Sequence, residues 1–339
     1  MNFSAEQANA LLVEVRNEAD LRVLINQLNT STHGNVTVLY SGSLNGTNIH
    51  TTTAINELKN NSDLRVLDNT EAFKFLDCLP DRNNNGHINN VELNQKLLDI
   101  FGDDPNEYGS RANQFLFGAK DELGQRIPNG AFDMVSTNFA KGGQGHAVAL
   151  VGFANEGQVF GASELPTSLK DSGFTHVNGI PTETLRNVAQ TEGMSEAFGI
   201  VRTQSQIDTM RISYTVDANG KVTGLDTGDL LSTRYGVQDT RPNPNLTNGH
   251  ITHRVSEDLD RVRQTNPEKF APLRPEHLQY KTVYQTPHID AQIQPSQQSL
   301  SQKLTPFQQA YQRDQLDQTF EQKTIRPHSV DTKHINGCK

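Results

Sequence analysis

The sequence predicts an α/β fold: a small, mostly parallel sheet with flanking helices, preceded by N-terminal helices and followed by a partly disordered C-terminal tail. Short apolar runs rich in Val and Leu alternate with segments of helical spacing between residues 36 and 180, as in folds that place helices between parallel strands. Residues 146–153 (HAVALVGF) form a nearly unbroken apolar run, which is typical of a strand buried on both faces.

The expected elements follow in order. Residues 4–28 have the apolar spacing of one or two amphipathic helices. Residues 36–40 (VTVLY) and 64–67 (LRVL) predict two strands, and helices are expected at 48–59 and 71–79. A helix over 131–140 leads into the strand at 147–151. The turn at 155–157 (NEG) then predicts a short strand at 159–161, and residues 175–178 predict another.

The later part of the chain is predicted to be less regular. Short helices are expected at 182–189 and 205–210, followed by a hairpin of residues 211–216 and 221–225. Beyond about residue 239, Pro, Gln, Asn and His dominate, and only helical pieces at 256–264 and 307–321 are expected. We therefore expect a helical segment (1–35), a central domain (36–238) and an appendage (239–339) that docks to a protein partner or serves export.

Composition and charge exclude several classes of protein. The net charge of −9 over 339 residues argues against nucleic acid or an anionic membrane as the main partner. Two cysteines far apart in the chain do not make a disulfide framework. The N-terminus lacks the basic flank and apolar core of a secretory signal, and no apolar run reaches the length of a membrane span. We expect a cytoplasmic protein, or one secreted without a signal peptide into a host or target cell.

Residues 81–92 (DRNNNGHINNVE) match the spacing of an EF-hand calcium loop. Gly86 would permit the sharp turn that such a loop needs, and helices are expected on both sides. Few of the ligands carry charge, so the affinity for Ca²⁺ should be modest, and the alternative is an Asn-rich loop. The expected ligands are Asp81, Asn83, Asn85, the backbone carbonyl of His87, and Glu92.

Glu164 is the first candidate for chemistry, because it follows the predicted pair of buried strands directly. A carboxylate at the mouth of a buried strand pair has a chemical use that a surface carboxylate lacks. The other interpretation is that Glu164 only caps the segment that begins at Pro166. The residues around it leave both open.

Four short motifs occur in the order seen in ADP-ribosyl cyclases and related NAD glycohydrolases. They are Tyr40-Ser41-Gly42, residues 67–70 (LDNT), the segment from Phe132 to residues 139–140 (FA), and residues 160–166 (FGASELP). Over about residues 36–180 the chain resembles this family, and in particular its bacterial toxin and effector branch, since the animal branch is disulfide-rich. The EF-hand-like segment looks like an insertion between two of the motifs.

The resemblance implies an enzyme that consumes NAD by cleaving the bond between nicotinamide and ribose, as a glycohydrolase or a cyclase. It makes Glu164 the catalytic carboxylate and Asp68 the acidic residue that governs the balance between cyclisation and hydrolysis. The nicotinamide side of NAD would stack on Tyr40 and Phe132. Further substrate contacts would come from Ser41, Ser136, Phe160 and Gly161, the last three near the phosphates.

The chain departs from the family pattern at its site. Asp68 is one methylene shorter than the usual Glu, and the two stacking aromatics are not Trp. Asp133, beside Phe132, is a charge not expected in a binding pocket.

Two other functions remain open. Residues 145–153 (GHAVALVGF) resemble the His-bearing strand of papain-like cysteine peptidases, with His146 as the base, but Cys78 lies late in its helix and Cys338 lies in the tail. The third possibility is a calcium-responsive binding protein without enzymatic activity.

Overall fold

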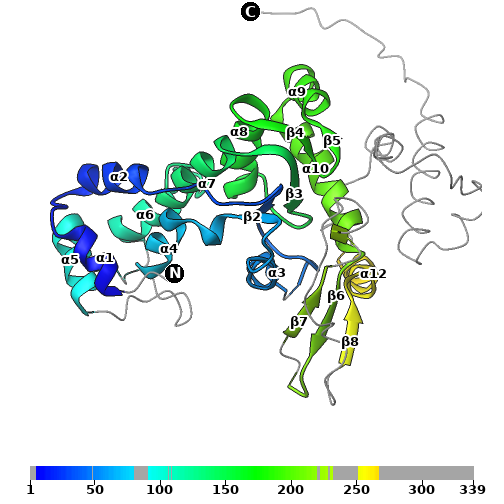
Figure 1. Ribbon diagram of the computed structural model, residues 1–339, viewed down its shortest axis with the longest axis horizontal. Helices are drawn as coiled ribbons and strands as arrows, with labels where there is room; N and C mark the ends of the chain where they lie inside the picture. Colours follow the sequence, from blue (N-terminus) through cyan, green and yellow to red (C-terminus); the bar gives the residue numbers. More distant parts are fainter. Residues whose placement is uncertain are drawn as a thin grey trace, which may run out of the picture.

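The computed structural model describes residues 5–266, except 48, 80–90, 106, 108, 220–221, 228–229 and 232–250. It confirms the predicted fold class, because a five-stranded, mostly parallel sheet with helices around it forms the centre of the molecule (Figure 1). The strand order is β2-β1-β3-β4-β5. The strands are β1 (Val36–Tyr40), β2 (Leu64–Val66), β3 (Gln144–Leu150), β4 (Gly173–Val177) and β5 (Ile180–Pro181).

The sheet contains a topological switch point between β1 and β3. The chain first places β2 on one side of β1, then crosses back to place β3 on the other side and β4 beyond it. These four strands are parallel, and β5 returns antiparallel to β4. In open α/β sheets, ligands bind outside the carboxyl ends of the strands at such a switch point, because the connections there diverge to opposite faces and leave a crevice.

The two faces of the sheet bury different sets of side chains. Alternate residues of β3 show this: Ala147 and Ala149 belong to one hydrophobic cluster, and Val148 and Leu150 belong to another. The first cluster is covered by η1 (Leu67–Asn69), α4 (Glu71–Cys78), α7 (Ala131–Lys141) and α8 (Leu165–Lys170). The second is covered by α3 (Thr51–Leu58).

The remaining helices extend the first cluster. The predicted N-terminal segment forms two helices, α1 (Ala5–Leu12) and α2 (Glu18–Gln27), which lie with α5 (Val91–Phe101) and α6 (Arg111–Phe117) at one end of the molecule (Figure 1). The predicted helix at 205–210 is the end of a much longer one, α10. Helix α9 spans Thr182–Thr191, and α10 spans Met194–Thr209. Among the residues placed by the structure, no helix is both long and apolar enough to cross a membrane.

A second sheet changes the expected division of the chain. The predicted hairpin forms as β6 (Ser213–Val216) and β7 (Val222–Asp226), and β8 (Ile251–Arg254) adds to the other side of β6. Helix α12 (Val255–Thr265) follows and buries Val255 and Leu259 in the cluster that α3 covers. Residues 251–265 are therefore part of the packed structure, so the expected boundary at residue 239 does not separate an appendage from the core.

The predicted strand at 159–161 is wrong. Val159 is already helical, and η3 (Phe160–Glu164), a π-helical turn, runs directly into α8. The reason lies in the strand order: β1 and β4 occupy both sides of β3, so a hairpin strand returning from β3 has no free edge to join.

The helices that flank the EF-hand-like loop are confirmed, since α4 ends at Cys78 and α5 begins at Val91. Residues 81–90 of the loop lie outside the described residues. The helical piece expected at 307–321 and Cys338 lie outside them as well.

Candidate active site

A cleft of about 610 Å³ lies at the carboxyl end of β1, at the switch point. Three phenylalanine rings in its lining form an aromatic wall, and hydroxyl groups from the loop after β1 and the start of α3 form a polar wall. Five residues that the family resemblance selected line this cleft together: Tyr40, Ser41, Phe132, Ser136 and Glu164. The remaining lining residues are Gly42, Ser43, Thr47, His50, Thr51, Thr52, Leu67, Phe73, Phe117, Arg126, Gln158 and Val159.

The π-helical turn places Glu164 at this cleft. The backbone N–H of Leu165 bonds the carbonyl of Phe160, one residue beyond the α-helical partner, which widens the turn. Glu164 is only 2% exposed, although it lines the cleft. Its Oε2 has no hydrogen-bond partner among the described residues. A buried carboxylate oxygen without a partner is rare in folded proteins and marks a place where a ligand can supply the missing contact.

The surroundings of Glu164 disfavour its charged form. Burial raises the pKa of this carboxyl to about 8, a hydrogen bond from Ser136 opposes the shift, and the charge of Asp133 adds to it. The chain's own groups therefore leave this carboxyl largely protonated at neutral pH. A positive charge brought into the cleft would favour the carboxylate, because an opposite charge nearby lowers the pKa of an acid.

Three phenylalanines build the aromatic wall. Phe117 and Phe132 stack with ring centroids 5.5 Å apart and planes 14° apart, and Phe73 meets Phe132 edge-on at 5.9 Å. The resemblance selected only Phe132, because Phe73 and Phe117 come from α4 and α6 and lie outside its motifs. Their helical spacing in the sequence predicts burial but not this convergence.

Tyr40 connects the cleft to Asp68. The Tyr40 hydroxyl donates a hydrogen bond of 2.6 Å to Oδ2 of Asp68, which lies in η1 after β2. Burial raises the pKa of Asp68, and the hydrogen bond from Tyr40 opposes that shift. Asp68 therefore lies behind Tyr40 and not among the lining residues, so its effect on a ligand passes through the tyrosine hydroxyl.

The polar wall is shaped by the loop after β1. Ser41 Oγ donates to Oε1 of Gln158 at 3.2 Å, which joins this loop to the segment before η3. Gly42 has a φ of +77°, and a Cβ at this position would lie 2.9 Å from the carbonyl oxygen of Phe153. Glycine is required there because the left-handed conformation and the close backbone both exclude a side chain.

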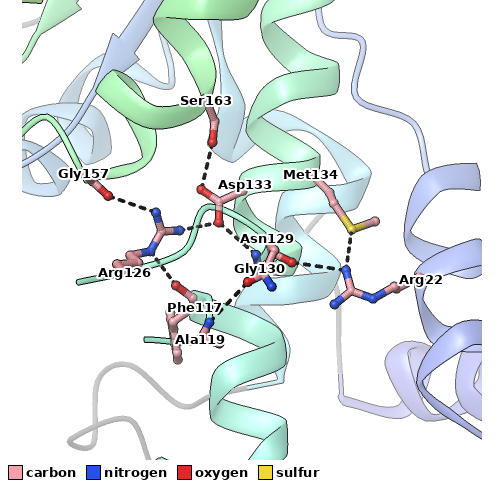
Figure 2. A network of polar contacts seen from close by, with 10 residues as sticks. All are labelled: Arg22, Phe117, Ala119, Arg126, Asn129, Gly130, Asp133, Met134, Gly157 and Ser163. Atoms are coloured by element: carbon pink, nitrogen blue, oxygen red, sulfur yellow. Dashed lines mark hydrogen bonds and ion pairs between the residues drawn. The ribbon is translucent and has the colours of Figure 1, made fainter. Parts of the chain in front are cut away.

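Asp133, the charge not expected in the pocket, does not line the cleft and lies in a polar network (Figure 2). Its carboxylate forms an ion pair with Arg126 and accepts hydrogen bonds from the Gly130 N–H at 2.9 Å and the Ser163 hydroxyl at 3.0 Å. Arg126 also donates to the carbonyls of Phe117 and Gly157, at 2.6 and 3.3 Å.

Two residues expected to contact the substrate are placed elsewhere. Phe160 is fully buried, with its ring 6.2 Å from that of Phe198. Gly161 packs against the backbone of Glu156, where a Cβ would lie 2.3 Å from the carbonyl oxygen. Neither lines the cleft. The helical conformation of this segment turns them into the core, whereas the strand assumed from the sequence would have pointed alternate residues outward.

The residues of the peptidase alternative do not form a site in the described part of the chain. Burial and the charge of Asp77 raise the pKa of Cys78, which disfavours the thiolate that such an enzyme requires. His146 lies at the amino end of β3, opposite the cleft, and its ring stacks on that of His176 with centroids 4.7 Å apart.

Of the expected calcium ligands, only Glu92 is described. It lies in the first turn of α5, and one of its carboxylate oxygens accepts a hydrogen bond of 2.8 Å from Asn9 Nδ2. Asp81, Asn83, Asn85 and His87 lie outside the described residues. The rest of the chain, as far as it is described, brings together no group of three His, Cys, Asp or Glu side chains that could hold a metal ion. Calcium binding stays a prediction.

Known proteins were compared with this chain at three levels. No family model matches the chain, no curated protein matches its sequence, and no solved structure matches its fold.

Proposed function

We propose that this chain is an NAD-consuming enzyme that cleaves the bond between nicotinamide and ribose, with Glu164 as the catalytic carboxylate. The observation that carries the proposal is the buried Glu164 oxygen without a partner, in a cleft with an aromatic wall. The family resemblance predicted Glu164, Tyr40, Ser41, Phe132 and Ser136 from separate segments of the sequence, and they line one cleft.

The chemistry fits these groups. Departure of nicotinamide leaves positive charge on the ribose, as in glycoside hydrolysis. A carboxylate held in a water-poor site stabilises such a cation more strongly than it would in water. NAD also carries a positive charge on its nicotinamide ring, and this charge favours ionisation of Glu164 on binding. The free cleft keeps the carboxyl protonated, and the substrate supplies the charge that ionises it.

The other residues position the substrate. The Phe117 and Phe132 rings offer a flat apolar surface on which an aromatic ring can stack and from which water is excluded. Ser136 bonds the Glu164 side chain and so limits its rotation. Tyr40 also lines the cleft, with its hydroxyl fixed by Asp68, so that its ring can present a second surface to the ligand.

The test is release of nicotinamide from NAD by the purified full-length chain. We expect Glu164→Gln to lower the rate by a factor on the order of 10²–10³ or more, since the charge that faces the ribosyl cation is lost while the volume is kept. Glu156→Gln is the matched control, because Glu156 is exposed and its side chain bonds only Ser195 among the contacts seen. This variant should retain the wild-type rate.

Two results would contradict the proposal. Equal rates for the wild type and Glu164→Gln would remove Glu164 from the chemistry. No release by the wild type from NAD or NADP, with or without calcium, would favour a binding protein over an enzyme.

A further inference from the structure

Arg126 and Glu164 line the same cleft but do not pair with each other. Arg126 is the one residue of fixed positive charge among the described residues that line the cleft. Its guanidinium binds Asp133 instead, and Oε2 of Glu164 is left without a partner in the part of the chain that is described. A carboxylate and a guanidinium that line the same cleft would ordinarily be expected to form an ion pair with each other.

Asp133 is placed to prevent that pairing. It accepts from Arg126 and the Gly130 N–H through Oδ2 and from the Ser163 hydroxyl through Oδ1. Ser163 directly precedes Glu164 in the π-helical turn. Asp133 and Ser136 are three residues apart on one face of α7, so this helix holds two successive residues of the turn, Ser163 through Asp133 and Glu164 through Ser136.

We propose that Asp133 is a positioning residue that sequesters Arg126 and anchors the π-helical turn, so that the Glu164 carboxylate stays free for a cationic centre of the ligand. This inference rests on the proposed function for the nature of the ligand. It adds that Glu164 is available to a positively charged group of the ligand because Asp133 keeps Arg126 from pairing with it.

The pKa of Glu164 depends on the polar and charged groups around it. Asp133 and Ser136 face it from α7, and Ser163 precedes it in the turn. Arg126, Tyr40 and His50 also line the cleft, and Asp68 lies behind Tyr40. Of these, Asp133 is the charge that acts on Glu164 most directly.

The experiment follows the ionisation of Glu164 by NMR of ¹³C-labelled glutamate carboxyls, with Glu164→Gln to assign the signal. Wild type should titrate near pH 8. In Asp133→Asn the freed guanidinium should pair with Glu164 and lower the midpoint by about 1–3 pH units, the effect of an opposite charge at contact. In Asp133→Asn combined with Arg126→Gln the midpoint should return toward the wild-type value, because the competing cation is gone.

Asp133→Asn combined with Arg126→Lys is the matched control. It keeps the cation and so should keep the low midpoint. Nicotinamide release should follow the same order: at least about tenfold slower in Asp133→Asn, partly recovered with Arg126→Gln, and not recovered with Arg126→Lys. If Asp133 and Arg126 only support the fold, the opposite is expected: both double variants should release nicotinamide at or below the rate of Asp133→Asn.

The outcomes separate the two proposals. An unchanged midpoint in Asp133→Asn, or no difference between the two double variants, overturns the positioning role even if nicotinamide is released normally. A wild type that releases no nicotinamide refutes the proposed function, while the titration still decides the positioning role. Should Asp133→Asn fail to fold, Arg126→Gln alone decides: it should raise the midpoint above that of the wild type, and an unchanged midpoint overturns the inference.

Discussion

Glu164 at the cleft and Asp258 on α12 are removed from water to a similar degree, at 2% and 4% exposed, yet their surroundings differ. Asp258 Oδ2 accepts hydrogen bonds from the Tyr214 hydroxyl at 2.5 Å and from Asn45 Nδ2 at 3.0 Å, and Arg261 lies 3.5 Å from Oδ1. Ser136 forms a hydrogen bond with the Glu164 side chain, but Oε2 of Glu164 has no hydrogen-bond partner among the described residues. A buried carboxylate with its partners stabilises a junction, whereas one without them costs stability and marks a candidate ligand site.

The Asp258 junction also shapes the cleft. Asn45 gives its amide N–H to Asp258 and accepts the backbone N–H groups of Thr47 and Ile49 with its Oδ1. Thr47 lines the polar wall. The second sheet and α12 therefore fix a loop that lines the same cleft as Glu164, so residues 251–265 support the cleft although their composition does not suggest it.

The largest difference between the two carboxylates should be in the pH dependence of stability. The pKa of Glu164 is raised from 4.5 to about 8, so between these values the folded state holds a proton that the unfolded state has lost. This contribution to stability is complete below pH 4.5 and is lost as pH rises through 8. At about 1.4 kcal/mol per pH unit, the loss is on the order of a few kcal/mol.

The measurement is urea denaturation from pH 5 to pH 9, with Glu164→Gln as the reference. Wild type should lose stability relative to this variant as the pH rises. Parallel curves would show that Glu164 titrates normally and would weaken the contrast with Asp258.

Removing the carboxylate of Asp258, which has its hydrogen-bond partners, should lower stability at every pH near neutrality. Asp258→Ala leaves the Tyr214 hydroxyl and the Asn45 amide buried without their acceptor, so we expect a loss of about 2–4 kcal/mol in the free energy of unfolding. Exposed Glu257 on the same helix is the control, and Glu257→Gln should change stability by less than about 0.5 kcal/mol. Equal effects of the two substitutions would mean that the junction contributes nothing.

The aromatic wall should affect activity more than stability. Phe132→Leu keeps most of the volume but removes the ring that stacks on Phe117, so kcat/KM for NAD should fall about tenfold, mainly through KM. Phe139 lies on the same helix, is fully buried and carries the Arg65 guanidinium over its ring, outside the cleft. Phe139→Leu should lower the unfolding midpoint and leave KM unchanged. The reverse pattern would place the substrate elsewhere.

The smallest effect on activity is expected for Asp68, which lies behind Tyr40. Asp68→Asn keeps an acceptor for the Tyr40 hydroxyl but removes the charge, so we expect a change in turnover of a few-fold and a shift in the ratio of cyclic to hydrolysed product, read by chromatography. Tyr40→Phe removes the hydrogen bond while keeping the ring. If Asp68→Asn abolished activity as Glu164→Gln should, the separation between catalytic and supporting carboxylates would not hold.

The sequence by itself determined the elements whose signals are local. The strands of residues 36–40, 64–67 and 147–151 follow from Val-rich apolar runs, and the hairpin of β6 and β7 follows from the two runs on either side of its turn. Thr70, a residue type favoured at helix N-caps, directly precedes α4, and its hydroxyl accepts the Phe73 N–H at 3.1 Å. Such patterns are readable because each is set by neighbours within a few residues.

Only the tertiary structure decided which residues come together to line the cleft. Phe73, Phe117 and Arg126 come from three separate segments, and none carries a local signal for the pocket that they line. The helix at 159–164 follows from the strand order, which leaves β3 without a free edge and turns Phe160 into the core. Asn45 and Asp258 meet although 213 residues separate them. Convergence of this kind depends on which strands pair and which faces are covered, and those choices are made by burial across the whole chain, not by any one stretch of it.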